Sequence, residues 1–347
     1  MSVRSKEYKV GLLGFGRVLR VFVKHYLENK AEIAKRFGFA LKFVAVADSR
    51  SFVSGNLDIK KLISNKEKGK FLNNSVKNPC EKFMPLIRNR KFDILIDGIP
   101  GSRIDEGVSY PFLFNAVKNG IHLVCTNKSP LVFKGDELLE LSKKKRVYVG
   151  ISATTAGALP ASGIINNELI NAGVYAVRGV LNGTSNFVLD KIMFESKTKL
   201  QAIQDAIKLG IAEPDYRFDL EGIDTCYKTI ILGLLLTGRC ADLKSVTCRG
   251  IMELDENDII LNVINGKVVR LVGNLLVKDG KPVISVQPEI LDKDDPLYGV
   301  YGSNKGVTFR TKYMGDLTLI GGASGLVAIG ATIIKDIINL HRFCCEK

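Results

Sequence analysis

The sequence has few of the side chains that usually build a zinc centre. It contains only three histidines, His25, His122 and His341, and these lie far apart. Its seven cysteines are odd in number and also lack the short spacing of metal ligands. Because zinc sites combine clustered histidines and cysteines, such a centre is not expected. Reduced thiols without a pairing pattern are typical of a cytoplasmic protein.

Long apolar segments are also missing. The longest run, Thr229–Thr237, is much shorter than the roughly 18–20 residues that a membrane-spanning helix needs. The first residues, Met1–Lys9, are polar and lead into a predicted strand, unlike a secretory signal. The chain contains no internal repeat and no low-complexity segment. We therefore expect a globular cytoplasmic protein with no membrane partner.

The charge of the chain is unevenly distributed. The formal net charge is +14, from 50 basic and 36 acidic residues among 347. Residues 1–150 carry 29 basic and 14 acidic side chains, whereas residues 151–347 carry 21 and 22. This asymmetry and the length favour two domains with different partners. The basic side chains are spread over several segments without a recognisable DNA or RNA module, so no nucleic-acid partner is expected.

Short apolar runs alternate with helix-length segments in the first half of the chain. Helices are expected over Ser109–Asn119 and Asp136–Lys144. Buried strands are expected over Val10–Leu13, Phe43–Ala47, Ile94–Ile96, Leu123–Val124 and Val147–Val149. This alternation predicts an α/β fold, with a doubly wound, Rossmann-type parallel sheet covered on both faces. Such a sheet binds nucleotides at its first strand-to-helix turn.

The first predicted strand ends in a glycine turn. Gly14 and Gly16 occupy the first two positions of the G-x-G-x-x-G pattern, but Leu19 stands at the third. Alone, two glycines also fit an ordinary tight turn. Because this turn follows a strand, opens a helix and precedes a second strand ending in Asp48, we favour a site for the pyrophosphate of a dinucleotide.

The residues after the second strand bear on the choice of cofactor. In this position an aspartate binds the ribose 2′-hydroxyl of NAD, whereas an arginine accommodates the 2′-phosphate of NADP. Here Asp48, Ser49 and Arg50 follow one another, and Lys66 and Lys68 come further along. A solvated charged turn is the alternative interpretation. Because the whole half-chain is basic, NADP(H) is favoured over NAD(H).

The densest group of charged residues lies between positions 210 and 228. Five carboxylates fall within residues 213–224, in a loop that leads into a helix with apolar residues on all sides at 230–236. Asp224 and Lys228 are four residues apart and therefore share one helix face. They form either a half-buried ion pair or a functional pair. Upstream, Ser185 or Asn186 is expected to cap a helix over Phe187–Phe194.

Short strands are predicted between Ser245 and Val307. Asp279-Gly280 lies between alternating apolar positions and predicts a hairpin over residues 273–286. A glycine-rich loop at 321–325 precedes an apolar helix, Val327–Leu340. We expect an α+β domain with a mixed sheet over residues 151–309, which would carry catalysis and dimerisation. Residues 1–150, completed by 310–347, would form the nucleotide domain.

Several of these motifs together resemble one enzyme family. They are the Gly14/Gly16 turn, Thr126-Asn127-Lys128, Ala158-Leu159-Pro160, Leu181-Asn182-Gly183-Thr184, the acidic block that ends at Lys228, and Asp295-Pro296-Leu297. This combination resembles homoserine dehydrogenases of the short, archaeal-like form without a regulatory domain. The resemblance implies NAD(P)-dependent interconversion of L-homoserine and L-aspartate 4-semialdehyde, in threonine and methionine biosynthesis, by a homodimer. The alternatives are a related small amino-acid dehydrogenase and a non-enzymatic NADPH-binding paralogue.

The resemblance also assigns roles to residues. It implies that Lys228, Lys128 and Asp224 are catalytic. The substrate would be bound by Gly210, Glu213, Asp219, Asp224 and Thr184. The cofactor would be bound by Gly14, Phe15, Gly16, Arg17, Val18, Asp48, Ser49, Arg50, Ile99, Pro100, Lys128 and Gly325. The carbonyls of Thr155, Gly157 and Leu159 would bind Na⁺ or K⁺ weakly.

The chain departs from the family pattern in the parts that handle the cofactor and the cation. Leu19 replaces the third glycine, Ile99 a hydroxyl residue, and Ser152 a glutamate of the cation loop. Ala323 replaces a glycine and Ile329 a threonine. The acidic block and its lysine are intact. Catalysis is therefore expected to be retained more securely than affinity for the cofactor.

Overall fold

The computed structural model describes residues 6–346 and divides into two compact units. The first unit comprises the chain up to Thr154 together with the segment from Leu326 onward, and the second unit comprises Thr155–Gly325. The second boundary differs from the predicted position near 310. Strands β11 (Lys305–Thr311) and β12 (Leu317–Gly321) pair antiparallel, so both belong to the sheet of the second unit.

The sheet of the first unit has the strand order β3-β2-β1-β4-β5-β6. All its neighbouring strands are parallel except β3, which runs antiparallel to β2. The strands are β1 (Lys6–Leu13), β2 (Phe39–Ala47), β3 (Phe52–Ser54), β4 (Ile94–Asp97), β5 (His122–Cys125) and β6 (Val149–Gly150). The order reverses between β1 and β4, as in doubly wound nucleotide-binding sheets. The predicted fold class is confirmed.

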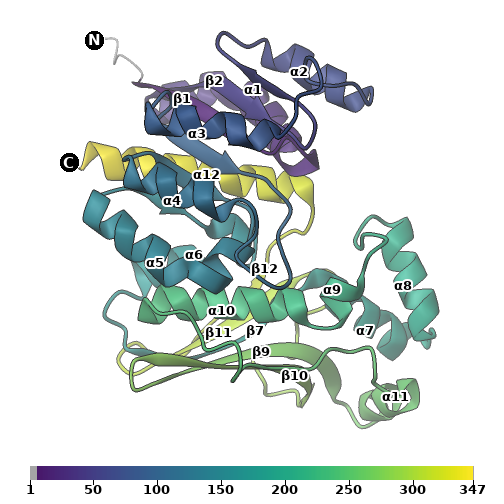
Figure 1. The fold of residues 1–347 in the computed structure, drawn as a ribbon. Coiled ribbons are helices and arrows are strands. Elements are labelled where there is room, and N and C mark those ends of the chain that lie inside the picture. The colour runs from purple at the N-terminus through teal and green to yellow at the C-terminus, as the bar shows by residue number, and fades with distance from the viewer. Residues whose placement is uncertain (1–5, 347) are drawn as a thin grey trace. The chain divides into compact units, whose positions relative to one another are not determined.

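Helices cover both faces of this sheet. The last helix, α12 (Leu326–Cys345), packs beside α1 (Arg17–Phe37), and Figure 1 shows it in yellow among the elements of the first unit. Their close approach depends on Gly330, where an added Cβ would lie 3.3 Å from the backbone of Phe22. The other helices are α2 (Ile59–Glu67), η1 (Pro79–Lys82), α3 (Phe83–Arg88), α4 (Tyr110–Lys118), α5 (Ser129–Lys145) and η2 (Ser152–Thr154).

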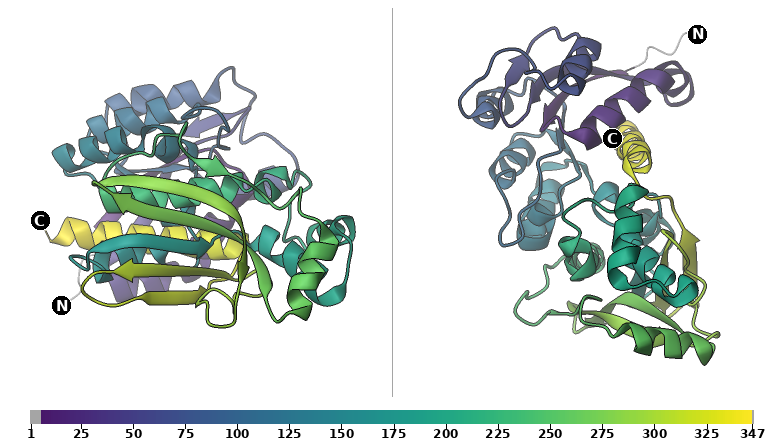
Figure 2. Two further views of the ribbon diagram at one scale, coloured as in Figure 1. Left: turned by 90° about the horizontal axis from the view of Figure 1, so that it is seen from below. Right: turned by 90° about the vertical axis from the view of Figure 1, so that its right-hand side faces the viewer.

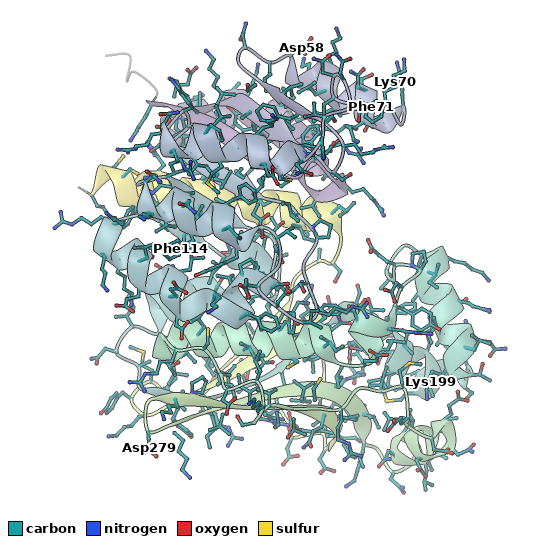
Figure 3. The ribbon with its side chains drawn as sticks, viewed as in Figure 1. Asp58, Lys70, Phe71, Phe114, Lys199 and Asp279 are labelled. Atoms are coloured by element: carbon teal, nitrogen blue, oxygen red, sulfur yellow. The ribbon has the colours of Figure 1, made fainter. Side chains whose placement is uncertain are left out.

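The second unit is built on a mostly antiparallel sheet of order β12-β11-β7-β9-β10-β8. Its remaining strands are β7 (Val174–Val180), β8 (Thr247–Cys248), β9 (Val268–Lys278) and β10 (Lys281–Leu291). Figure 2 (left) shows the long strands side by side. The predicted hairpin is confirmed: Asp279 and Gly280, with φ of +50° and +68°, form the turn between β9 and β10 (Figure 3). Two consecutive positive φ values are typical of the tight hairpin turn that Asp-Gly favours.

The buried helix α10 (Ile223–Thr237) lies against β9 and β10. Two glycines permit this contact, since a Cβ on Gly273 would lie 2.2 Å from Thr229 Oγ1 and one on Gly233 2.9 Å from Pro282 Cβ. The predicted interior helix is confirmed. The other helices of the unit are α6 (Ala161–Gly163), η3 (Ile164–Glu168), α7 (Gly183–Glu195), α8 (Lys199–Lys208), α9 (Arg217–Leu220) and α11 (Glu256–Ile264).

The segment 245–307 differs from the short strands predicted for it. It contains α11, whose N-cap Asp255 accepts hydrogen bonds from the backbone of Asn257 and Asp258, and two long strands, β9 and β10. Among residues 6–346, no helix combines the length and the apolar character that crossing a bilayer requires.

Candidate active site

The glycine turn lies where the strand order of the first sheet reverses. Gly14 has a φ of +92°, and a Cβ there would lie 2.6 Å from the carbonyl carbon of Gly98, in the loop after β4. Gly16 is the N-cap of α1, with no side-chain cap, and an added Cβ would meet no atom within 4 Å. The first turn of α1 carries no acidic residue. This open backbone at a helix N-terminus fits the pyrophosphate of a dinucleotide.

The structure explains why Leu19 can replace the third glycine. A Cβ on Gly98 would lie 2.5 Å from Leu19 Cγ, so the leucine side chain fills the space that Gly98 leaves free. The third glycine of the usual pattern serves close packing between helix and strand. Here the glycine on the neighbouring loop provides the room instead.

The other predicted cofactor residues of this turn differ in exposure. Phe15 is 1% exposed and packs in the hydrophobic core of the first unit. Arg17 is exposed and Val18 is half-buried. Of these three side chains, that of Arg17 is the most accessible to a ligand.

Asp48 is already occupied by hydrogen bonds at the end of β2. Its Oδ1 accepts from the backbone N–H of Arg50 at 2.8 Å, and from the backbone N–H and hydroxyl of Ser51 at 2.7 and 2.9 Å. Lys66 Nζ lies 2.6 Å from Oδ2. Burial favours a raised pKa for Asp48, but the hydrogen bonds from Lys66, Arg50 and Ser51 lower its pKa overall. The carboxylate therefore stays charged and is neutralised by Lys66.

The cations around Asp48 are placed by different elements. Lys66 lies in the last turn of α2, whereas Arg50 is exposed and its guanidinium stacks 5.1 Å above the ring of Phe71. Phe71 is labelled in Figure 3 in the loop that follows α2. Ser49 and Lys68 are also exposed. The predicted ribose-binding segment thus presents more positive than negative charge.

A buried carboxylate that the sequence did not single out holds the loop after β4. Asp97 is fully buried, and its Oδ1 accepts from Ile99 N–H at 3.0 Å. Burial raises the pKa of Asp97 to about 7, against hydrogen bonds from Ile99, Ser109 and Asn127. Ile99 is thereby fixed at the carboxyl end of β4. Lys128, next to Asn127, is half-buried and is the N-cap of α5.

The charged block of the second unit forms one hydrogen-bonded network. Lys228 Nζ lies 2.6 Å from Asp224 Oδ2 and also donates to the carbonyl of Leu181 at 2.8 Å. Asn182 Nδ2 donates to Asp224 Oδ2 and to Asp219 Oδ1, each at 2.7 Å. The prediction that Asp224 and Lys228 share one helix face is confirmed, and both side chains are nearly buried.

Asn182 is the connecting residue that sequence reasoning missed. Its Oδ1 accepts from Ser185 N–H at 2.8 Å and caps α7, which begins at Gly183. The prediction that Ser185 or Asn186 would cap a later helix is therefore wrong. The signal in the sequence was the asparagine itself, because asparagine is a preferred N-cap residue and Asn182 comes directly after an apolar strand. With the cap satisfied by its oxygen, the amide nitrogen is left to bind the two carboxylates.

Asp219 has a strongly perturbed environment. Burial raises its pKa, and the charge of Asp224 adds to this effect. Hydrogen bonds from Asn182 and Thr184 and the charge of Lys228 oppose it. Two neighbouring carboxylates that share one amide beside a lysine, one of them with a raised pKa, are a pattern that functional sites often show.

The remaining predicted substrate residues surround this network unevenly. Thr184 Oγ1 donates to the carbonyl of Ile211 at 3.2 Å and so ties the start of α7 to the loop after α8. Gly210, in that loop, has a φ of +69°, and a Cβ there would meet no atom within 4 Å. The side chain of Glu213 is exposed. The structure thus brings Thr184, Asp219, Asp224 and Lys228 together, with Glu213 on the adjacent surface.

The predicted cation loop offers only neutral oxygens. Thr155, Gly157 and Leu159 lie between η2 and α6, and the carbonyl of Leu159 already accepts from Ala161 N–H at 2.8 Å. Within residues 6–346, no three acidic, histidine or cysteine side chains are grouped as a metal site. Ser152 is engaged elsewhere, since its N–H donates to Asp336 Oδ2 at 2.9 Å. A loop of carbonyls without a carboxylate fits, at most, a weakly bound monovalent ion.

The glycine-rich loop 321–325 follows β12. Gly322 has a φ of +77°, and a Cβ there would lie 2.6 Å from Leu159 N. Lys305 Nζ donates to the carbonyls of Gly322 and Ala323, at 3.0 and 3.3 Å. Gly325, predicted to contact the cofactor, has a φ of +107° and is exposed.

Comparisons with known proteins identify the family of this chain. The family model for homoserine dehydrogenase matches residues 160–338. The homoserine dehydrogenase of Pyrococcus horikoshii is 30% identical over 96% of this chain and 97% of its own length. The NAD(+)-dependent homoserine dehydrogenase of Pseudomonas canavaninivorans is 28% identical over 98% of both chains.

Solved structures give the same result. The crystal structure of a putative homoserine dehydrogenase from Archaeoglobus fulgidus is 26% identical, with a TM-score of 0.84 over 96% of this chain and 99% of that one. The likeness therefore spans both units and is not confined to a shared nucleotide fold. The chain belongs to the homoserine dehydrogenase family.

Proposed function

We propose that this chain catalyses the NAD(P)-dependent interconversion of L-homoserine and L-aspartate 4-semialdehyde. The observation that carries the proposal is the network in which Lys228 is held by Asp224 and Leu181. Oxidation removes a hydride from the carbon that bears the hydroxyl and a proton from its oxygen. When bound, the cofactor supplies the hydride acceptor. The protein must then provide a group that takes the proton.

Lys228 is suited to exchange that proton. A lysine ammonium has three N–H donors, and two of these are committed, to Asp224 Oδ2 and to the carbonyl of Leu181. The third is available for the substrate oxygen. During oxidation the neutral amine accepts the hydroxyl proton, and during reduction the ammonium returns a proton to the forming alkoxide. Asp224 fixes the direction of the amine and stabilises its charged form.

The substrate is a zwitterion, so its ammonium requires a carboxylate. Asp219 lies beside the pair, and its Oδ1 is held by Asn182. Exposed Glu213 belongs to the adjoining loop. We assign these two acids, with Thr184 and the backbone of Gly210, to the amino-acid part of the substrate.

Oxidation of L-homoserine by the purified full chain tests the proposal directly. Formation of NADPH or NADH is followed with NADP and NAD in parallel, with and without Na⁺ or K⁺. We expect turnover with L-homoserine and little with a panel of other small hydroxy amino acids. Tight NADPH binding without oxidation of any of these substrates would favour the non-enzymatic alternative, and turnover of another panel member would favour a related dehydrogenase.

The first unit supplies the cofactor site in this proposal. Lys66 neutralises Asp48, which would otherwise repel a 2′-phosphate, and the exposed Arg50 lies two residues further on. These cations support a preference for NADP, although one relative is named as NAD(+)-dependent. Gly14, Gly16 and the N-terminus of α1 would hold the pyrophosphate. In the second unit, the carbonyls of Thr155, Gly157 and Leu159 would hold a monovalent cation.

Arg50→Ala should reduce the preference for NADP over NAD. Losing one charge-assisted hydrogen bond to the 2′-phosphate should lower the ratio of the two kcat/KM values about tenfold. The two values are measured with each cofactor at saturating homoserine. Arg88→Ala, which removes another exposed arginine of the first unit, serves as the matched control. An unchanged ratio in Arg50→Ala would rule out the assigned role of this side chain.

The sheet of the second unit supports the proposal of a homodimer. Leu276 and Val283 lie opposite each other in the β9–β10 register and are 48% and 51% exposed. Apolar pairs on an open sheet face are typical of surfaces that another chain covers. Val283→Asp should therefore convert the dimer to monomers in sedimentation equilibrium. Ile264→Asp, at an equally apolar exposed position on α11, should leave the dimer intact. A monomeric wild type would contradict the proposal.

A further inference from the structure

A buried lysine occurs at the start of β11. Lys305 is only 5% exposed, and its two hydrogen bonds go to neutral acceptors, the carbonyls of Gly322 and Ala323. Burying an ammonium costs free energy unless its charge is compensated or has a function. Two backbone carbonyls need a donor but not a full positive charge. The charge of this residue therefore needs a further explanation.

The strand pairing places Lys305 beside the end of β7. Gly306, the next residue, is paired with Val180, and Lys305 itself is paired with Gly321. Directly after Val180 come Leu181, whose carbonyl binds Lys228, and Asn182, which binds both carboxylates. The strand register thus brings Lys305 close to Leu181, whose carbonyl binds the candidate catalytic residue Lys228.

The electrostatic surroundings of Lys305 agree with this placement. The charges that act on Lys305 are those of Lys228 and Asp224, both on α10. Burial and, to a smaller extent, the charge of Lys228 lower the pKa of Lys305 to about 8, against the opposing charge of Asp224. The group around Lys228 contains two carboxylates, of buried Asp224 and half-buried Asp219. Lys305 adds a second positive charge to this group, next to that of Lys228.

We propose that Lys305 is a positioning residue of the reaction, whose ammonium places a second positive charge beside the Lys228–Asp224 pair. This inference rests on the proposed function. Lys305 does not exchange a proton with the substrate. It adds positive charge to the surroundings of Lys228, so that the amine can release and take up a proton without leaving the two carboxylates uncompensated. Its hydrogen bonds also fix the Gly322–Ala323 segment to the same strand.

A purely structural role makes a different prediction about pH. A neutral lysine amine still donates hydrogen bonds to Gly322 and Ala323, so loss of these bonds would affect a variant equally at every pH. A role of the charge disappears when the wild-type amine becomes neutral. Since that change occurs near pH 8 in the wild type, the two roles are separable by comparing wild type and variant on either side of this pH.

The test compares wild type and Lys305→Met in homoserine oxidation between pH 6.5 and 9.5. We expect kcat/KM of the variant to be about tenfold lower at pH 7, as for one charge acting through a protein interior. Above pH 9 the difference should shrink to the pH-independent part that loss of the two hydrogen bonds causes. Lys305→Arg should recover part of the loss at pH 7. Lys281→Met, which removes an exposed lysine of the same unit, should match the wild type at all pH values.

The outcomes separate this inference from the proposed function. A wild type that oxidises no homoserine at any pH overturns both. An active wild type with a constant ratio to Lys305→Met at all pH values overturns the role of the Lys305 charge and leaves the proposed function in place. If Lys305→Met does not fold, as judged by circular dichroism, Lys305→Gln and Lys305→Arg are compared in the same way, and equal loss in both again overturns the inference.

Discussion

Lys228→Met should reduce kcat for homoserine oxidation by about 10²–10⁴-fold, the range that a positioned general acid–base contributes. Methionine has nearly the same length as lysine but can neither accept nor donate the proton of the substrate hydroxyl. The loss should appear at all pH values between 6 and 9. Steady-state kinetics with saturating NADP and homoserine measure it.

The matched control for this prediction is Lys208→Met, since Lys208 is an exposed lysine at the end of α8 in the same unit. NADPH binding, followed by its fluorescence, should be unchanged in both variants because neither Lys228 nor Lys208 is among the predicted cofactor residues. Turnover of Lys228→Met within threefold of the wild type would end the assignment of Lys228 as the proton-transfer group.

Asn182→Asp should lower kcat/KM about 10–100-fold at neutral pH, because buried acceptors that lose a donor cost about 1–3 kcal/mol. Aspartate preserves the shape of the side chain and is also a good N-cap, so α7 should still begin at Gly183. What changes is the group facing Asp219 and Asp224, since a donor amide becomes a third carboxylate.

The loss in Asn182→Asp should depend on pH in a defined direction. The pKa of Asp219 is already raised in the folded protein, and a third carboxylate raises it more. A carboxyl with a raised pKa in the folded state binds more protons folded than unfolded, so stability falls as pH rises above its unfolded value. Urea unfolding should therefore show a larger deficit against wild type at pH 8 than at pH 5. A deficit that is equal at both pH values would contradict the placement of Asn182 between two carboxylates.

Asn182→Ser distinguishes the charge from the missing donor. Serine keeps a capping oxygen and removes the amide nitrogen, without adding a charge. It should show a smaller loss of kcat/KM than Asn182→Asp. Its stability deficit should also increase less with pH, because losing the amide donor raises the pKa of Asp219 without the added effect of a third carboxylate.

Features that depend on local pattern could be predicted from the sequence. The alternation of buried runs and helices indicates the doubly wound sheet, and the Asp279-Gly280 turn indicates the hairpin, because each depends on residues close together in the chain. The pairing of Asp224 with Lys228 follows from helix geometry alone. The family was identifiable from motifs, and the comparisons confirm it.

Features that depend on distant contacts could not be predicted. From the sequence, Leu19 is a departure from the glycine pattern of the family. Only the structure shows that Gly98, in a different loop, makes room for its side chain. Lys305 reads as an ordinary strand lysine until the pairing of β11 with β7 brings it to the end of that strand. The sequence alone does not locate the start of α7, because Asn182, Ser185 and Asn186 are all good capping residues. Distant contacts distinguish them, since the side-chain amide of Asn186 donates to the carbonyls of Val300 and Gly302.

The position of α12 has a consequence for how the protein forms during synthesis. The first unit begins at the start of the chain, yet α12, which packs on α1, is made only after the whole second unit. Residues such as Ile333 and Ile337 belong to the core around β1 and α1. Until they leave the ribosome, the emerging sheet has an uncovered apolar surface that can misassociate. The second unit, which is contiguous in sequence, can therefore complete its own core first, and the unit that begins the chain is the last to be finished.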